Sequence, residues 1–284
     1  TAIKAAGFDL LTTANNHAFD RGEAGVIRTI EQIKFNHLNY NGTFLSERDR
    51  DSTRIFDIKG IKVAFLAYTY GLNGFSIPRG KDYLINFIDT IKIKNDIKFA
   101  RSKGIDIVVV HLHFGDEYQR TPNKYQKDIV RSIIDSGADI IIGGHTHVLQ
   151  PIEFFKTNKT KLDSGFVIYS IGNFISNQRW RYSDGGAILT FSLKKDFRRD
   201  SVYLKDVEYL PIWAFKGNTR NGREYILIPS ESAFNDTTYS FLTPADRKLA
   251  AESFYDTKEI LTKNSSRPKL NDIYKMNVAS GNKR

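Results

Sequence analysis

The sequence contains no cysteine, and this absence excludes several kinds of chemistry. The chain can form no disulfide, no thiolate metal site and no cysteine nucleophile, so any metal site has to use nitrogen and oxygen ligands. Long apolar runs are also missing, because none approaches the roughly 20 residues that a membrane helix needs. We therefore expect no membrane-spanning helix within these 284 residues.

Charge is unbalanced but spread along the chain. Lys and Arg number 42 against 32 Asp and Glu, which gives a net charge of +10. A basic chain can bind a polyanion, whether nucleic acid, an anionic envelope or an acidic polymer. The basic residues are scattered and no run reaches five, so a solvated surface is the competing interpretation. Basic and aromatic residues do not cluster as in known nucleic-acid-binding modules, so there is no strong nucleic-acid signal.

Helical and extended patterns alternate through the first half of the sequence. Apolar residues recur at helical spacing in three segments, residues 23–37, 86–103 and 123–136. Three short apolar stretches predict strands, at residues 61–68, 105–112 and 138–142. Strands that are apolar throughout indicate sheets covered by helices, which is an α/β fold.

The second half is mainly β in pattern, with strands predicted at residues 166–171, 187–193 and 202–210. Beyond about Pro211 the periodicity fades, although a helix is predicted from Pro244. Residues 264–284 are polar enough to form a mobile tail. We predict one domain over residues 1–213 and a C-terminal extension over residues 214–284.

Five of the six histidines lie at the C-terminal ends of predicted elements. They are His17 in ANNHAFDRG, His111 and His113 in VVVHLHFGDEY, and His145 and His147 in GGHTHVLQP. Loops at the strand ends of an α/β sheet converge, so ligands and chemistry gather there. Each pair spaced i, i+2 shares a strand face or converges from the loop that follows. The two glycines before His145 let the backbone turn tightly and approach a ligand.

Imidazole suits Zn, Fe, Ni or Mn, so one interpretation of this pattern is a mixed nitrogen and oxygen metal site. The alternative for any single histidine is a polar side chain satisfied within the fold. Pairing favours ligation at His145 and His147, and at one or both of His111 and His113. If only one of His111 and His113 binds the metal, the other lies in the core or supports a ligand.

Two asparagines precede His17. An amide oxygen from Asn15 or Asn16 can bind a hard metal while the neighbouring imidazole acts as an acid. The sixth histidine, His37, falls at the end of a predicted helix and is interpreted as structural.

The order Asn-His, His-x-Gly and Gly-His-x-His, each after a strand, resembles the metallophosphatase (calcineurin-like phosphoesterase) superfamily. More narrowly, four segments resemble the bacterial capsule-synthesis, poly-γ-glutamate-associated CapA (PGA_cap) family: GFDLLTTANNHAFDRGEAG, HLHFGDEYQRTP, GADIIIGGHTHVLQPIE and FVIYSIGNFISNQ. The resemblance covers about residues 3–174. It implies an αββα sandwich, in which two mixed β-sheets are flanked by helices.

The resemblance also implies roles for individual residues. It makes His17 the general acid near the leaving group, and it makes metal ligands of Asn16, His113, His145 and His147. Asp20 and Glu117 lie where the family keeps acidic residues, which orient His17 and the nearby loop; with His17, Asp20 completes the expected catalytic pair. Three further residues are expected behind the ligands or towards the substrate: Asn15, His111 and Asn173. The segment Gly172-Asn173-Phe174 matches a family signature whose role the sequence does not reveal.

The superfamily takes its first metal ligands, and a carboxylate that bridges two metals, from motifs upstream of the Asn-His. This chain starts after them, so we expect the first strands of the fold and part of the site to lie outside it. A bridging carboxylate is needed to hold two divalent ions about 3.5–4 Å apart. In the complete protein we expect two divalent ions, Mn, Fe or Zn.

Two functions stay open on the sequence alone. The first is metal-dependent hydrolysis of a phosphoester or related bond. The second is a non-catalytic module that binds a polyanion or assembles with other proteins of capsule or poly-γ-glutamate synthesis and export. Both imply an acidic polymer or phosphoester partner and a place in the bacterial cell envelope or outside the cytoplasm, with any anchor or signal outside this chain.

Overall fold

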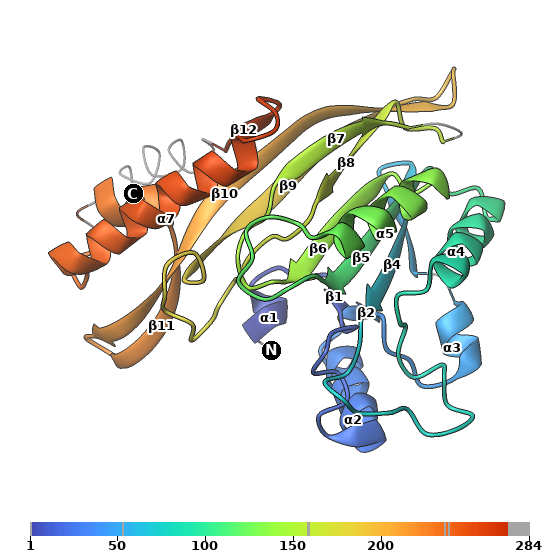
Figure 1. The fold of residues 1–284 in the computed structure, drawn as a ribbon, viewed down its shortest axis with the longest axis horizontal. Helices are drawn as coiled ribbons and strands as arrows, with labels where there is room; N and C mark the ends of the chain where they lie inside the picture. The colour runs from blue at the N-terminus through green and yellow to red at the C-terminus, as the bar shows by residue number, and fades with distance from the viewer. Residues whose placement is uncertain (1, 53, 158–159, 236, 238, 272–284) are drawn as a thin grey trace.

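The computed structural model describes residues 2–271 except residues 53, 158–159, 236 and 238. Within them, two mixed β-sheets pack against each other and helices flank the pair (Figure 1). This arrangement confirms the α/β class that the sequence pattern predicts and the two mixed sheets that the family resemblance implies. None of the described helices is long and apolar enough to span a membrane.

The larger sheet has six strands. Their order is β3 (Arg54–Ile58), β4 (Ile61–Thr69), β5 (Ile107–Phe114), β6 (Ile140–His145), β8 (Ser164–Ile168) and β7 (Ile152–Lys156). Strands β4, β5, β6 and β8 run parallel, whereas β3 and β7 run antiparallel at the two edges. The parallel strands end at the same edge, which places the loops after β5 and β6 side by side.

Two helices, α4 (Thr90–Ser102) and α5 (Lys124–Asp135), cover one face of the larger sheet (Figure 1). Buried apolar residues of both helices form one core cluster with residues of β4, β5 and β6. The start of α5 agrees with the sequence, because Asn123 and Gln126 form a reciprocal capping box.

The predicted start of the preceding helix at Asn86 is wrong. Helix α4 begins at Thr90, because the Asp89 carboxylate accepts hydrogen bonds from the Ile91 and Lys92 N–H groups and caps the helix there. The chain before it is extended, and the Ile88 N–H donates to the carbonyl of Thr69.

The second sheet covers the other face of the larger one. It consists of β9 (Gly185–Asp196), β10 (Ser201–Thr219), β11 (Gly222–Pro229) and β12 (Pro268–Leu270). Strand β10 is antiparallel to β9 and β11 and parallel to β12. Between the sheets lies a core that combines residues of β5, β6 and β8 with residues of β9 and β10.

The C-terminal part packs on the second sheet through α6 (Ser230–Asn235) and α7 (Pro244–Thr262). The helix predicted from Pro244 is confirmed, with Thr243 capping its first turn. The division at residue 213 stays a prediction, and β10 runs through that position. Of the predicted tail, residues 268–270 form β12, and residues 272–284 lie outside the described part.

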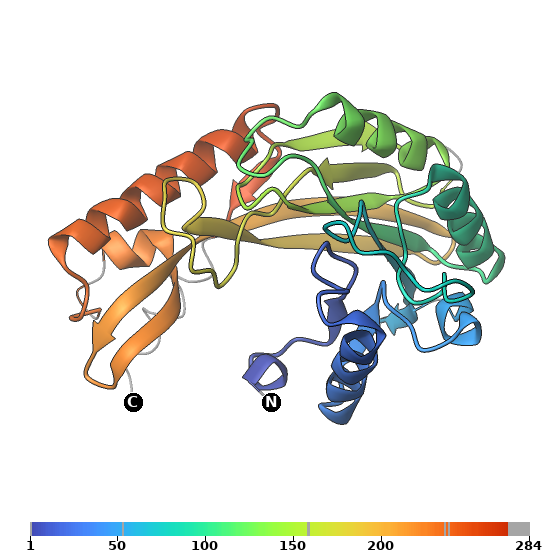
Figure 2. The ribbon, with the colours of Figure 1, turned by 60° about the horizontal axis from the view of Figure 1, so that its bottom comes forward.

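The N-terminal part contains α1 (Ala2–Ala5), β1 (Leu10–Thr12), α2 (Gly22–Phe35), β2 (Asn39–Asn41) and α3 (Glu47–Asp51). Strands β1 and β2 pair in parallel, and α2 connects them. In both views α2 lies far from α7 and β11 (Figure 1, Figure 2). Buried residues of α2 form a separate core with residues around β2.

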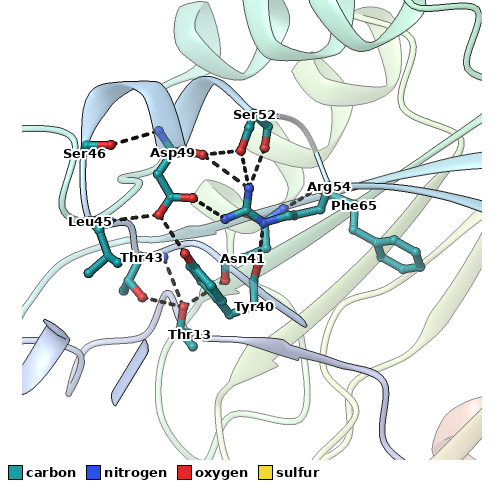
Figure 3. Close-up of polar contacts among 10 residues, drawn as sticks. All are labelled: Thr13, Tyr40, Asn41, Thr43, Leu45, Ser46, Asp49, Ser52, Arg54 and Phe65. Atoms are coloured by element: carbon teal, nitrogen blue, oxygen red, sulfur yellow. Dashed lines mark hydrogen bonds and ion pairs between the residues drawn. The ribbon is translucent and has the colours of Figure 1, made fainter. Parts of the chain in front are cut away.

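A polar network joins this small sheet to the larger one (Figure 3). The Thr13 hydroxyl donates to the Asn41 carbonyl at 3.0 Å and lies 2.7 Å from the Thr43 hydroxyl. The Asn41 amide donates to the carbonyl of Phe65 in β4. These bonds fix the chain at Thr13, two residues before the Asn15-Asn16-His17 segment.

Candidate metal centre

Asn16 and His113 meet although 97 residues separate them in the chain. The Asn16 Oδ1 atom lies 2.8 Å from Nε2 of His113, the last residue but one of β5. The other end of the Asn16 amide donates to Oδ1 of Asn73 at 3.0 Å, and the amide oxygen faces the imidazole. Asn16 is buried, which limits competition from water for this contact.

The imidazoles of His145 and His147 lie next in line. Strand β6 runs beside β5 and ends at His145, and the centroids of the His113 and His145 rings are 4.8 Å apart. The centroids of the His145 and His147 rings are 6.2 Å apart. The structure thus brings the four predicted ligands to one edge of the sheet.

The tight bend after β6 is made by the histidines themselves. His145 and His147 have φ values of 100° and 61°, in the left-handed region that side chains with a Cβ rarely adopt. Such backbone is held only when its surroundings impose it, and it is typical of functional sites.

The expectation that the two glycines turn the backbone is wrong. Both lie inside β6. A Cβ on Gly143 would stand 1.8 Å from the carbonyl oxygen of Tyr169. Glycine is therefore required here, because the backbone at Tyr169 packs directly against it. Gly144 has more room, since a Cβ there would lie 3.7 Å from Nε2 of His111.

Burial keeps these imidazoles neutral. It lowers the pKa of His111 to about 4. Burial, with the neighbouring imidazoles, lowers the pKa of His113 to about 2. Burial also lowers the pKa of His145, although the Glu117 carboxylate opposes that shift. A neutral imidazole offers a nitrogen lone pair, which is the form that binds a metal ion.

The donor set fits a divalent transition metal. The Nδ1 atoms of His111 and His145 are buried and have no hydrogen-bond partner within the described part of the chain. Together with the Asn16 oxygen, neutral imidazoles form the mixed nitrogen and oxygen environment that suits Zn, Fe or Mn. Among the described residues, no group of three or more His, Asp or Glu side chains is arranged so that it could hold a metal ion.

His17 lies at the exposed side of the cluster. Its Nδ1 atom is 2.8 Å from Oδ2 of Asp20, and 65% of its side chain is exposed. The Oδ1 atom of Asn15 accepts a hydrogen bond from the His17 backbone N–H at 2.9 Å, so Asn15 shapes the turn instead of facing the imidazoles. Asp20 orients the His17 ring and leaves its Nε2 atom free of that contact.

His147 is held from both sides. Its Nδ1 atom lies 3.0 Å from Oδ1 of Asn173, and its Nε2 atom lies 3.8 Å from Oε1 of Glu117. The Tyr118 ring stacks on the imidazole with a centroid separation of 5.6 Å and an angle of 23°. Glu117 and Asn173, both expected near the ligands, therefore lie at opposite nitrogens of one imidazole.

Sequence reasoning missed several residues of this site. Asn73 contacts both Asn16 and His17. The centroids of the Tyr70 and His145 rings are 4.7 Å apart, and the Tyr118 ring stacks on that of His147. The Asn73-Gly74 dipeptide is a turn signal that could have drawn attention to Asn73, which has a φ of 51°. No signal marked the tyrosines.

The chain resembles known proteins in sequence over most of its length. The profile of the family described as "Bacterial capsule synthesis protein PGA_cap" matches residues 1–178. The "Capsule biosynthesis protein CapA" of Bacillus anthracis is 32% identical over 196 residues, which cover 68% of this chain and 46% of that protein. The "PGA biosynthesis protein CapA" of Bacillus subtilis (strain 168) is 32% identical over 204 residues, covering 68% of this chain and 49% of that protein.

Solved structures are similar at lower identity. The NAD nucleotidase (NadN) of Haemophilus influenzae is 14% identical with a TM-score of 0.48, and the match covers 99% of this chain and 52% of that one. A putative 5'-nucleotidase from Staphylococcus aureus is 17% identical with a TM-score of 0.48, covering 88% of this chain and 42% of that one.

The chain spans about half the length of the curated relatives it matches. The family profile nevertheless covers well over half of this chain, from its first residue through the Gly172-Asn173-Phe174 segment. The family prediction made from the sequence motifs is therefore confirmed. The chain belongs to the bacterial capsule synthesis protein PGA_cap family.

Proposed function

We propose that this chain acts in capsule or poly-γ-glutamate biosynthesis and hydrolyses a phosphoester or related bond in a metal-dependent reaction. The observation that carries the proposal is the 2.8 Å contact between Oδ1 of Asn16 and Nε2 of His113. It brings the Asn-His motif to the histidines of β5 and β6, which is where a phosphoesterase would need them. The names of the relatives refer to capsule and PGA biosynthesis, and they support the proposed biosynthetic role.

The ion would be held by the Asn16 oxygen and by the imidazoles of His113, His145 and His147. A divalent ion bound there would supply Lewis acidity towards a phosphoryl oxygen. Without metal, the short contact is a hydrogen bond from the His113 N–H to Asn16, and ligation requires that nitrogen to lose its proton. Two ions, Mn, Fe or Zn, are proposed for the complete protein.

His17 serves as the proton donor to the leaving group in this proposal. Its exposure gives a bulky leaving group access to the ring, and the contact between Nδ1 and Asp20 turns Nε2 outward. Proton donation by a positioned side chain contributes about 10²–10⁴-fold to a rate. Asp20 contributes by holding the ring.

The substrate class is an acidic polymer or a phosphoester, and the net charge of +10 favours an anion in either case. Other proteins of capsule or polyglutamate synthesis are proposed as partners. A site of action in the bacterial cell envelope or outside the cytoplasm follows from that role.

The test uses the complete protein and takes aryl phosphate monoesters and diesters as probes, with Mn²⁺, Fe²⁺ or Zn²⁺ added. Wild type is expected to turn over at least one probe, while His17→Ala binds the metal equally well and loses about 10²–10⁴-fold in kcat. His37→Asn is the matched control, because it removes an exposed imidazole that is not a candidate ligand and keeps a residue that tolerates a positive φ. Absence of turnover by metal-loaded wild type would overturn the hydrolytic proposal.

The second candidate is a non-catalytic module that binds a polyanion during polymer synthesis or export. The observation that favours it is that, among the described residues, His, Asp and Glu alone form no group of three suited to a metal. This candidate predicts binding of poly-γ-glutamate that weakens steeply with salt, without turnover of any phosphoester. Turnover that depends on His17 would exclude it.

A further inference from the structure

A closed chain of contacts surrounds His147. The Nδ1 atom of His147 meets Oδ1 of Asn173 at 3.0 Å, and Nδ2 of Asn173 donates to Oε1 of Gln178 at 2.9 Å. Nε2 of Gln178 in turn donates to the hydroxyl of Tyr118 at 3.0 Å. The Tyr118 ring stacks on the His147 ring, so the contacts form a closed loop.

The orientation of the Asn173 amide is fixed by the backbone. Its Nδ2 atom lies 2.8 Å from the carbonyl oxygen of Ser183, which can only accept a hydrogen bond. The NH₂ group must therefore point to Ser183 and Gln178, and the amide oxygen must point to His147. Ser183 is itself buried, so water cannot easily replace Asn173 as the hydrogen-bond donor to the Ser183 carbonyl.

A fixed amide oxygen determines which nitrogen of His147 carries the proton. Because Oδ1 of Asn173 has no hydrogen to give, the contact at 3.0 Å requires an N–H on Nδ1 of His147. In the neutral ring the Nε2 atom then has a lone pair. That atom faces Oε1 of Glu117 at 3.8 Å, too far for a direct hydrogen bond between them.

Tyr118 keeps the ring from rotating out of this arrangement. The residue has a φ of 64°, and its backbone N–H donates to the Thr146 carbonyl at 2.7 Å. The backbone strain is thus held by a hydrogen bond to the residue that precedes His147. Stacking on one face and the Asn173 contact at the edge leave one orientation for the imidazole.

We propose that Asn173 is a positioning residue that holds His147 as the Nδ1–H tautomer and thereby presents the Nε2 lone pair to a divalent metal ion. The metal-binding half of this inference rests on the proposed function, whereas the tautomer does not. It also gives a physical role to the Gly172-Asn173-Phe174 segment, which the sequence singled out without explaining.

The first measurement is the ¹⁵N and ¹H nuclear magnetic resonance spectrum of the histidine rings, without metal, at about pH 8 where an ordinary imidazole is neutral. A His147→Gln variant assigns the signals. We expect the Nδ1–H form in wild type and a loss of that preference in Asn173→Ala. An Nε2–H form in wild type, or an unchanged tautomer in Asn173→Ala, would overturn the proposal.

Asn173→Asp and Gln178→Ala separate positioning from general stability. Asn173→Asp keeps an acceptor for His147 but loses the donor to Ser183, so it should retain the tautomer while the protein melts at a lower temperature. Gln178→Ala removes the hydrogen bonds of Gln178 with Asn173 and Tyr118 but leaves the contact between Asn173 and Ser183, so the tautomer should again persist. Loss of the tautomer in both, in step with melting temperature, would show a merely structural role and contradict the inference.

The second measurement is Zn²⁺ or Mn²⁺ affinity by calorimetric titration. Removing the partner of a ligating histidine typically costs 10–100-fold in affinity, so Asn173→Ala should bind about 10–100-fold more weakly and Asn173→Asp should recover most of the loss. Equal affinity in wild type and Asn173→Ala would overturn the metal-binding half. If wild type itself binds no metal, the proposed function fails and the tautomer measurement still decides the role of Asn173.

Discussion

The Asn16 amide oxygen lies 2.8 Å from Nε2 of His113, and this contact joins the loop after β1 to the end of β5. The nitrogen of the same amide donates to Oδ1 of Asn73 at 3.0 Å. The contact therefore places an amide oxygen and an imidazole nitrogen together, beside the imidazoles of His145 and His147. The predictions below test the parts that hold this arrangement.

Asp20→Asn tests whether the carboxylate positions His17. The substitution keeps the size of the side chain but removes the charge that faces Nδ1 at 2.8 Å. We expect kcat for an aryl phosphate to fall by less than the roughly 10²–10⁴-fold loss expected for His17→Ala, with metal affinity unchanged. Because both side chains are largely exposed, the melting temperature should not change. An equal kcat in wild type and Asp20→Asn would contradict the role given to Asp20.

Gly143→Ala and Gly144→Ala form a matched pair within β6. The Cβ in the first would stand 1.8 Å from the Tyr169 carbonyl oxygen, whereas in the second its nearest neighbour is 3.7 Å away. We expect Gly143→Ala to lower the free energy of unfolding by about 3 kcal/mol or to prevent folding, since overpacking forces the backbone to shift. Gly144→Ala should change it by less than about 1 kcal/mol. Chemical denaturation measures both, and equal stabilities would show that the close approach to Tyr169 is wrong.

The network in Figure 3 predicts acid sensitivity at Asp49. Burial alone would raise the pKa of Asp49, but hydrogen bonds from the Leu45 amide, from Arg54 and from Tyr40 outweigh it and lower that pKa. The same burial and the Asp49 charge raise the pKa of Tyr40 to about 12. A carboxyl whose pKa is lowered on folding stabilises the protein above the pKa of the unfolded chain, about 3.9 for aspartate. That stabilisation is lost as the pH falls through the lowered value.

Asp49→Asn should therefore be less stable than wild type by about 2 kcal/mol at neutral pH, from the loss of charged hydrogen bonds. The difference should shrink as the pH falls below about 4, because the unfolded chain then takes up a proton that folded Asp49 binds only at its lowered pKa. Asp51→Asn, at an exposed position of the same helix, should have little effect at either pH. A pH-independent difference for Asp49→Asn would contradict the assignment.

The sequence predicts the larger sheet and its helices because those elements carry local signals. The capping box at Asn123 and the glycines after residues 103 and 136 mark helix ends that the structure reproduces closely. The start of α4 was predicted wrongly, since apolar spacing extends back to Phe87, while Asp89 caps the helix and the preceding chain pairs with Thr69. A strand contact of that kind depends on residues far away in sequence.

The candidate ligands could be predicted from motif spacing, but the contacts between them could not. Asn173 and Gln178 reach His147 and Tyr118 from a loop after β8, and nothing in the local pattern encodes that meeting. The glycines before His145 were predicted to matter for a turn, whereas Gly143 matters for its distance from Tyr169. Contacts of this kind between strands can be recognised only once the strands are placed side by side in the fold.

The most direct test of the proposed metal centre is a calorimetric titration of Mn²⁺ or Zn²⁺ into the complete protein as wild type, Asn16→Ala, His113→Ala and the control His37→Asn. The account predicts saturable binding to wild type and His37→Asn, and at least about tenfold weaker binding to the other two, because losing a ligand should cost no less than losing a ligand's supporting partner. No binding to wild type, or equal binding to wild type and His113→Ala, would contradict a metal centre at the meeting point of Asn16 and His113.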